Sequence, residues 1–300
     1  MRDLLLFALA GFVASLVDGA LGMGFGPTSS SILLTVGLAP AAVSTSVNIA
    51  KVATGLVAAV SHWRFRNVDR TLVLKLAGPG AVGAIVGVTV LASIEGAVLR
   101  PYLALLLTVI GVRILIRFAR PMERSKNDQS PPDARGKRTL YYDQRGVKTA
   151  AFLGGITNGM IGAWGPVVTP FLLHRGLRPR FAIGCVNTAE VAVAGASAFS
   201  LLAALGGGGF NAGVVAAMLV GGIVAAPVAA WFIRKVPPRP VGVSVAALLL
   251  LTNARELTAW AGVSSAGWLW TIYLSIVGIV VGALFFFRGS RAEMESAPAP

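Results

Sequence analysis

The ionisable side chains of Asp18, Lys51 and Glu190 lie within otherwise apolar stretches of this 300-residue chain. Around Lys51, the residues Ser44, Asn48 and Lys51 follow each other at i, i+4 and i+7, which places them on one face of a helix. Ionisable groups at membrane depth are costly, and they usually face the bundle interior, where they are paired or functional. This lysine and these carboxylates are chemically suited to binding an anion and exchanging a proton.

A glycine- and proline-rich segment precedes the polar stretches in both halves of the chain. The first copy begins at Asp18 and the second at Asn158, and from Pro27 or Pro166 onward the copies align without a gap. The matched positions are Gly26 and Gly165, Pro27 and Pro166, Gly37 and Gly176, Pro40 and Pro179, Asn48 and Asn187, and Lys51 and Glu190. Apolar segments broken by Gly and Pro at corresponding positions of two halves point to a transporter binding site.

Each broken segment offers a helix end inside the membrane. Pro27 and Pro166 are typical of a first helical position, so a half-helix is expected to start at each. Its amides and positive dipole end favour an anion. The alternative is that these glycines only permit close helix packing, as Gly83-x-x-x-Gly87 is expected to do.

The residues predicted to form the site come from both copies. The proton-coupling residues are expected to be Asp18 and Glu190, and no metal site or cofactor is expected. The substrate-binding residues are expected to be Gly24, Phe25, Gly26, Thr28, Ser29, Asn48, Lys51, Trp164, Gly165 and Asn187.

Lys51 and Glu190 occupy equivalent positions of the two copies. One hypothesis is that they form an ion pair, with Lys51 adding positive potential for the substrate and Glu190 exchanging a proton. The alternatives are a purely structural ion pair or two interface residues that snorkel outward. Asp18 is either a proton site or a cap near the tip of the broken segment.

Composition indicates the environment of these segments. Hydrophobic residues make up 55% of the chain and charged residues 13%, and the mean hydropathy is +0.76. A soluble domain has a charged fraction of roughly 25%, so the chain is expected to be an integral membrane protein. Besides the broken segments, about 4–38 and 149–173, seven spans are expected, near 41–62, 71–92, 101–118, 181–205, 212–233, 241–257 and 267–287.

Basic residues in the short loops predict the topology, because Lys and Arg mark the cytoplasmic side. Five clusters occur: 64–70, 117–148, 175–180, 234–239 and 288–291. All five clusters can lie on the cytoplasmic side only if the segment 149–173 enters the membrane from that side and returns to it as a re-entrant hairpin. Three spans then separate the linker from the first broken segment, so the two halves are expected to be inverted. For the first segment a kinked full crossing remains an alternative.

The expected fold is therefore an all-α polytopic membrane protein with an inverted repeat. Each half has a broken, re-entrant glycine-rich segment followed by three transmembrane helices, and one extra helix lies at the C-terminus. The expected boundaries are 1–118 for the first repeat, 119–148 for a basic cytoplasmic linker, 149–260 for the second repeat, 261–288 for the last helix and 289–300 for a disordered tail.

Several other classes of protein are disfavoured. The net charge of +14 suggests nucleic acid, but the basic residues lie in loops between apolar segments. The single Cys185 excludes an internal disulfide. The N-terminus lacks a convincing signal-peptide cleavage site. The sequence has neither a Walker A loop nor a His-Glu-x-x-His helix, so direct ATP drive and an enzyme are not expected.

These residues resemble the TauE/SafE sulfite-exporter family of anion transporters. The resemblance rests on the paired glycine-rich segments, the Gly-Leu-x-Pro turns at Gly37 and Gly176, and the loop Ser61-His-Trp-Arg-Phe-Arg-Asn-Val-Asp69, and it covers nearly the whole chain. It implies transport of small sulfur-containing or organic anions across the bacterial inner membrane. The chain departs from the family's run of three glycines at Phe25 and Trp164, which are expected to narrow or line the cavity and to select the substrate.

Three functional hypotheses follow. The first is a secondary transporter of a small organic or sulfur-containing anion, of the sulfite, sulfonate or sulfoacetate type, which works by alternating access and is coupled to protons. The second is a transporter of a cation or neutral solute that uses Asp18 and Glu190 as coupling carboxylates. The third is a membrane-embedded enzyme or scaffold. The expected partners are a small anion and the lipid bilayer, with a homodimer as an option and without nucleic acid.

Overall fold

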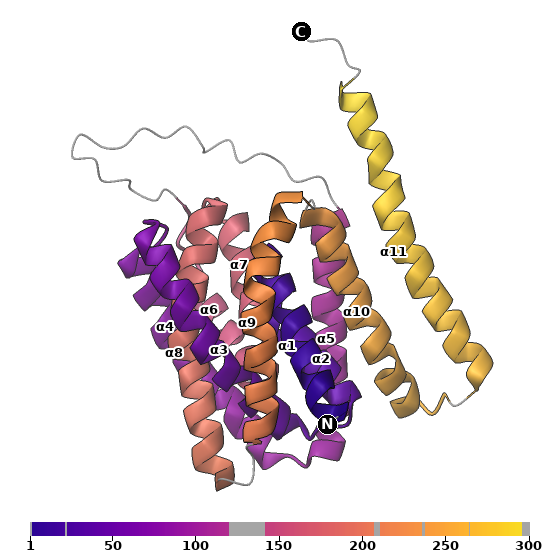
Figure 1. Ribbon diagram of the computed structural model, residues 1–300, viewed down its shortest axis with the longest axis horizontal. Coiled ribbons are helices and arrows are strands. Elements are labelled where there is room, and N and C mark those ends of the chain that lie inside the picture. Colours follow the sequence, from indigo (N-terminus) through magenta and orange to yellow (C-terminus); the bar gives the residue numbers. More distant parts are fainter. Residues whose placement is uncertain are drawn as a thin grey trace.

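The computed structural model describes residues 2–21, 23–119, 142–206, 211–235, 238–263 and 265–295. Within these ranges the protein contains eleven helices and no strands (Figure 1). The helices are α1 (Arg2–Leu21), α2 (Phe25–Thr35), α3 (Pro40–Arg64), α4 (Arg70–Ser93), α5 (Gly96–Ala119), α6 (Val147–Ile161), α7 (Gly165–His174), α8 (Pro179–Leu205), α9 (Ala212–Lys235), α10 (Pro238–Trp260) and α11 (Ala266–Glu295).

Among the described residues, five helices are long and apolar enough to cross a membrane: α3, α4, α5, α8 and α10. All five were expected from the sequence, and their ends lie within a few residues of the expected ones. The two other expected spans are also helical, as α9 and α11. The all-helical, polytopic part of the expected fold is therefore confirmed.

Both broken segments are interrupted helices, α1–α2 and α6–α7. The second arm begins slightly earlier than expected: α2 starts at Phe25, two residues before Pro27, and α7 starts at Gly165, one residue before Pro166. The reason is that the first four amides of a helix lack intrahelical acceptors, so proline is tolerated at any of these positions and does not mark the first one.

The two second arms end in the same local structure. In α2, the amide of Gly37 donates to Leu34 and the amide of Leu38 to Leu33. The same pair of bonds, a Schellman motif, closes α7 around Gly176. Gly37 and Gly176 have φ of 99° and 85°, values that glycine adopts without strain. The Gly-Leu-x-Pro turns of the sequence are therefore helix stops.

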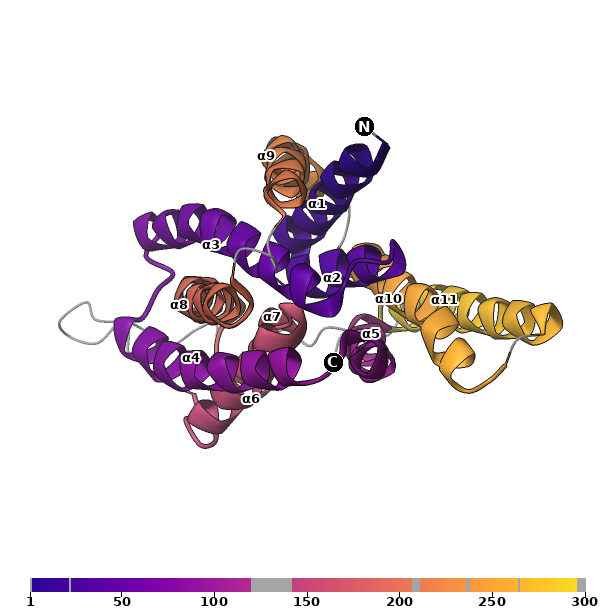
Figure 2. The same cartoon turned by 90° about the horizontal axis from the view of Figure 1, so that it is seen from below.

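The first arm of each broken segment packs on a helix of the other half, α1 on α9 and α6 on α4 (Figure 2). Small residues allow this approach. A Cβ at Gly83 would lie 2.1 Å from the Phe152 carbonyl oxygen, and one at Gly87 would lie 2.2 Å from that of Ile156. In the same way, a Cβ at Gly221 of α9 would lie 1.9 Å from the backbone of α1. The expected packing role of Gly83-x-x-x-Gly87 is confirmed.

Helices α3 and α8 lie side by side and run antiparallel. Lys51 pairs with Glu190, whereas His62, further along α3, lies 3.5 Å from the Asn187 side chain, which is earlier in α8. Residue numbers thus rise along one helix as they fall along the other. The contact joins the two halves of the chain.

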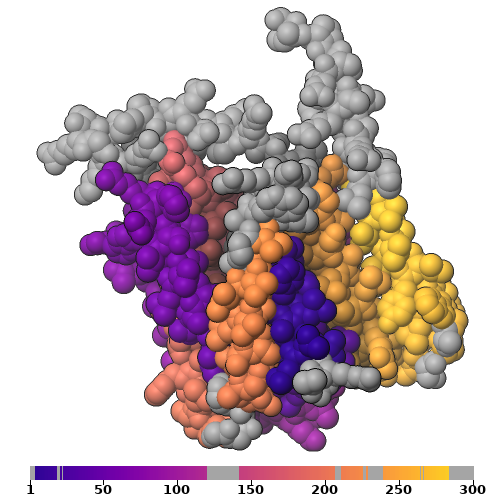
Figure 3. Space-filling view, viewed as in Figure 1, coloured from indigo at the N-terminus to yellow at the C-terminus, as the bar shows by residue number. Residues whose placement is uncertain are grey.

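Helices α5 and α10 also pack together in antiparallel directions. The rings of Tyr102 and Trp260 lie 6.2 Å apart, and a Cβ at Gly242 would lie 2.2 Å from the Phe118 ring. Helix α11 lies at the edge of the molecule against α10 (Figures 1 and 3).

Helix α2 runs antiparallel to α5. Near the start of α5, the Arg100 guanidinium donates to the carbonyls of Gly37 and Leu38, at the end of α2. Near the end of α5, the Arg117 guanidinium lies 3.9 Å from the sulfur of Met23, just before α2 begins. The interruption between α1 and α2 therefore lies near the C-terminal end of α5.

Two buried apolar clusters form the core. One gathers side chains mainly from α1, α2, α3, α5, α9 and α10, and the other from α4, α6, α7 and α8. Most of the expected linker, residues 120–141, lies outside the described residues. The tail was expected from residue 289, whereas α11 continues to Glu295, and residues 296–300 are outside the described residues.

Candidate functional site

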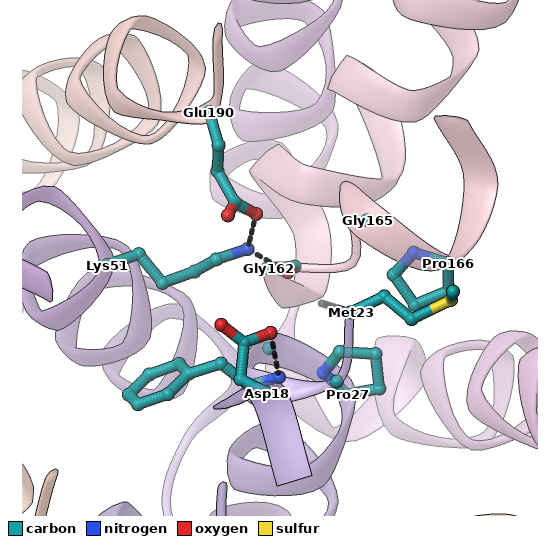
Figure 4. A pocket seen from close by; sticks show the side chains of 11 residues that line it. Asp18, Met23, Pro27, Lys51, Gly162, Gly165, Pro166 and Glu190 are labelled. Atoms are coloured by element: carbon teal, nitrogen blue, oxygen red, sulfur yellow. Dashed lines mark hydrogen bonds and ion pairs between the residues drawn. The ribbon is translucent and has the colours of Figure 1, made fainter. Parts of the chain in front are cut away.

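The non-helical segment between α1 and α2 meets the one between α6 and α7 inside the protein. A Cβ at Gly26 would lie only 1.7 Å from the Gly162 carbonyl oxygen, so backbone touches backbone at this point. Side chains fill the small pocket that surrounds the contact so closely that no water-sized space is left. The pocket is lined by Asp18, Met23, Gly24, Phe25, Gly26, Pro27, Lys51, Gly162, Gly165, Pro166 and Glu190 (Figure 4).

The C-terminal end of α6 is one wall of this region. A helix leaves its last four carbonyls without intrahelical donors, and burial makes such orphans costly. Here hydroxyl and ammonium groups of the first half satisfy three carbonyls at the end of α6: Ser30 donates to Ile161 (2.7 Å), Ser44 to Gly159 (2.7 Å) and Lys51 to Gly162 (2.6 Å). Ser30, Ser44 and Lys51 thus supply the donors that the end of α6 lacks.

Lys51 uses all three of its donors within the protein. Its ammonium pairs with Glu190 and donates to the Gly162 carbonyl at 2.6 Å and to the Asn158 side-chain oxygen at 3.2 Å. An ammonium has three N–H groups, so this coordination is complete. The side chains of Lys51 and Glu190 are 4% and 12% exposed, which makes this a buried pair. The expected Lys51–Glu190 ion pair is present, and snorkelling is excluded.

Asp18 lies at the start of α2. Its carboxylate accepts a hydrogen bond of 3.3 Å from the Phe25 amide, and Gly24, at the cap position, has no side chain for this role. Figure 4 shows Asp18 and Glu190 on opposite sides of the Lys51 ammonium. With one ammonium and two carboxylates, the three ionised groups sum to one negative charge. Asp18 thus occupies the position of a cap, which is compatible with either of the two roles that the sequence left open.

An amide network adjoins the charged groups. Asn158 donates to the Asn48 side-chain oxygen at 2.7 Å and to the Ser197 hydroxyl at 3.0 Å, and Asn48 donates to the Ser44 carbonyl at 2.9 Å. All four residues are fully buried. This network fixes the orientation of Asn158, whose side-chain oxygen then faces Lys51.

The structure brings together about half of the residues predicted for the site. Those that line the pocket are Asp18, Gly24, Phe25, Gly26, Lys51, Gly165 and Glu190. Those that lie elsewhere are Thr28, Ser29, Asn48, Trp164 and Asn187. Gly24 has φ of 153°, and a Cβ there would lie 2.5 Å from the Val17 side chain, so its role is conformational as well.

The residues outside the pocket have other partners. The Ser29 hydroxyl donates to the Phe25 carbonyl of its own helix, and that of Thr28 is buried without a partner. The indole of Trp164 donates to the Val186 carbonyl at 3.0 Å and packs against α4. Asn187 lies beside His62. The expectation that Trp164 lines the cavity therefore does not fit its orientation.

Sequence reasoning left Asn158 and Gly162 out of the site. Both were visible in the repeat: Asn158 opens the second copy as Asp18 opens the first, and Gly162 follows it. Their relevance comes from the end of α6, where an amide oxygen and a backbone carbonyl both face Lys51. Met23, Pro27 and Pro166 complete the lining.

The sequence matches the family described as "Sulfite exporter TauE/SafE" over residues 7–256. The chain belongs to this family. It is also 38% identical over 288 residues to the "Probable membrane transporter protein YtnM" of Bacillus subtilis (strain 168), and the match covers 95% of the chain and 93% of that protein. No solved structure matches the chain.

The match to the TauE/SafE family spans both chain breaks and every residue of the pocket. Together with the five long apolar helices, it identifies a multi-pass membrane transporter of the bacterial inner membrane. The family resemblance of the sequence is thereby confirmed.

Proposed function

We propose that this member of the TauE/SafE family is a secondary transporter of a small organic or sulfur-containing anion, of the sulfite, sulfonate or sulfoacetate type, rather than an enzyme. One observation carries the proposal. The N-terminal ends of α2 and α7 meet at a buried pocket that also contains the Lys51 ammonium. Helix N-termini and an ammonium are the groups that bind oxyanions in proteins.

The electrostatics of the two helix ends support an anion. Both α2 and α7 present first-turn amides with partial positive charge, and both ends lie beside the contact of Gly26 with Gly162. In the low-dielectric interior, such dipoles act more strongly than at a surface. The Asp18 carboxylate already bonds to the Phe25 amide, which is direct support for the affinity of this position for a negative group.

Helix directions support an inverted repeat. α3 and α8 are equivalent in the two copies of the repeat, and so are α5 and α10, yet each pair runs antiparallel. Copies related by an axis along the membrane normal would have parallel equivalents. Antiparallel equivalents are expected for an axis in the membrane plane, and they support the proposal that the two broken segments are re-entrant from opposite sides.

The core supports alternating access. One apolar cluster contains α4 with α6, α7 and α8, and the other contains the equivalent set, α9 with α1, α2 and α3, together with α5 and α10. We propose that these two bodies rock against each other about the pocket. The residue boundaries of the repeats, a cytoplasmic basic linker and a homodimer remain predictions of the sequence.

A second candidate function is transport of a cation or a neutral solute. It is favoured by the excess of one negative charge in the Asp18, Lys51 and Glu190 cluster. In this case the two carboxylates would carry a coupling ion, and no anion would need to enter.

Flux measurements in proteoliposomes separate these functions. The panel consists of radiolabelled sulfite, sulfoacetate, methanesulfonate, taurine and acetate, with and without a pH gradient. If the protein transports anions, uptake of at least one radiolabelled anion should be saturable. The other anions should compete with this uptake, whereas taurine, a zwitterion, should not. Sodium- or potassium-dependent flux of taurine without anion uptake would favour the second candidate, and no flux of any solute would overturn both.

A further inference from the structure

The start of α2 already holds an internal anion. The Asp18 carboxylate accepts from the Phe25 amide, at 3.3 Å, on the first turn of a helix whose cap residue, Gly24, lacks a side chain. The Thr28 hydroxyl, on the same turn, is fully buried and has no hydrogen-bond partner.

Asp18 is held at this position by the backbone amides of Phe25 and Gly24 and not by a direct bond to Lys51. Charge-assisted N–H to carboxylate bonds are typically about 2.7–2.9 Å long, so the 3.3 Å bond to Phe25 is a long one. Lys51 cannot add a bond to Asp18, because its three N–H groups are engaged by Glu190, Gly162 and Asn158. Of the two carboxylates, Asp18 is therefore the one that can leave its place without breaking an ion pair.

Charge limits what can enter. Asp18, Lys51 and Glu190 together carry one negative charge when ionised, and a bound monoanion would make two. Burial of two unbalanced charges is strongly unfavourable in this setting. One proton on a carboxylate restores the charge of the unloaded pocket when the anion binds.

The repeat identifies which carboxylate takes the proton. Asn158 opens the second copy where Asp18 opens the first, and its neutral amide contacts Lys51. A protonated Asp18 would have the same neutral form and nearly the same shape as that asparagine. Glu190, in contrast, pairs with the Lys51 ammonium, so that protonation of Glu190 would break this ion pair.

We propose that Asp18 occupies the anion site at the start of α2 in the unloaded transporter and leaves it on protonation, so that each anion enters with one proton. The inference rests on the proposed anion transport. One O–H bond forms on Asp18, the Phe25 amide becomes available to the anion, and the proton leaves Asp18 when the anion is released on the other side.

The charged groups that face Asp18 are Lys51 of α3 and Glu190 of α8. The helices packed on α1 are α2, α9 and α10. The sequence of α2 has no ionisable residue, and that of α9 has none before Arg234. Those of α10 are at its ends: Arg239, Arg255 and Glu256.

The test measures accumulation of radiolabelled methanesulfonate, a monoanion at all pH values used, in proteoliposomes with a pH gradient. With one proton per anion, a gradient of one pH unit gives about tenfold accumulation on the alkaline side. Asp18→Asn, which has the neutral form permanently, should equilibrate without accumulation, and its exchange rate should not fall at high pH. Asp143→Asn, a carboxylate change outside the pocket, is the matched control and should accumulate like the wild type.

The outcomes are distinct. Wild-type flux without accumulation, or accumulation that persists in Asp18→Asn and is lost in Glu190→Gln, overturns the inference while anion transport stands. Absence of any anion flux in the wild type overturns both. If Asp18→Asn does not fold, a measurement on the wild type decides: in weakly buffered detergent solution, saturating methanesulfonate should cause uptake of about one proton per transporter, and no uptake would contradict the inference.

Discussion

Replacement of Lys51 by Met separates a functional charge from a structural one. Lys51→Met has a similar length but removes the ammonium that pairs with Glu190 and bonds to the Gly162 carbonyl. Removal of one partner of a buried ion pair typically costs about 3–5 kcal/mol, because a charge is left without compensation. The side chains are 4% and 12% exposed, so solvent offers little relief. We expect this loss in the free energy of unfolding.

The double variant Lys51→Met with Glu190→Gln removes both charges. The Gly162 carbonyl then remains without its donor, and such an orphan costs about 1–3 kcal/mol. The double variant should therefore be more stable than Lys51→Met by about 2 kcal/mol. If Lys51 supplies positive potential to an anion, transport should stay absent in both variants.

Unfolding in mixed detergent and lipid micelles gives the stability, and anion uptake into proteoliposomes gives the activity. The comparison forms a double-mutant cycle with Glu190→Gln as its fourth member. Two results would refute the reasoning. Equal stability of Lys51→Met and the double variant would contradict the buried ion pair, and recovery of anion transport in the double variant would reduce Lys51 to a structural role.

Three further predictions concern the contact of the chain breaks, the topology and the pH dependence of stability. Gly26→Ala should abolish folding or transport, because its Cβ would lie 1.7 Å from a carbonyl oxygen, whereas Gly78→Ala, with no atom within 4 Å, should be tolerated in the same uptake assay. Cysteines introduced at Ala39 and Arg180, in a background without Cys185, should react with a membrane-impermeant maleimide from opposite sides; labelling from one side would contradict inverted halves. The pKa of Asp143 is lowered because the Arg145 amide donates to its carboxylate, and the Arg175 guanidinium adds to this. Its stabilising effect is therefore present above the unfolded-state pKa of about 3.9 and is lost as the pH falls through the folded-state pKa, so the difference in melting temperature between wild type and Asp143→Asn should be largest near neutral pH and disappear in acid.

The sequence by itself determined the class of protein and most of the helices. Exposure of long apolar stretches to water is unfavourable, and in a membrane their backbone polar groups must bond within the segment, as in a helix. Hydropathy was therefore enough to locate α3, α4, α5, α8 and α10. The Gly-Leu-x-Pro turns end their helices through hydrogen bonds between residues close in sequence, so they could be recognised from the sequence as helix ends. The starts of α2 and α7 were displaced, because proline fits several positions of a first turn, and α11 continues beyond the expected start of the tail.

The composition of the pocket was only partly visible in the sequence. The sequence identified Asp18, Lys51 and Glu190 as pocket residues, because charged residues in apolar helices are rare and are usually paired or functional. It did not identify Asn158 or Gly162 as partners of Lys51, since this role depends on where α6 ends relative to α3. Nor did the sequence show that the Trp164 side chain points away from the pocket, because its orientation depends on contacts with other helices, such as the hydrogen bond to the Val186 carbonyl.

Only the tertiary structure decided which groups share the pocket. Lys51 and Glu190 are far apart in the chain and meet because α3 and α8 pack in antiparallel directions. Gly26 and Gly162 meet because neither has a side chain that would keep the two breaks apart. The repeat first visible in the sequence thus supplies the groups, whereas long-range packing determines that Lys51 and Glu190 lie beside Asp18 at the start of α2.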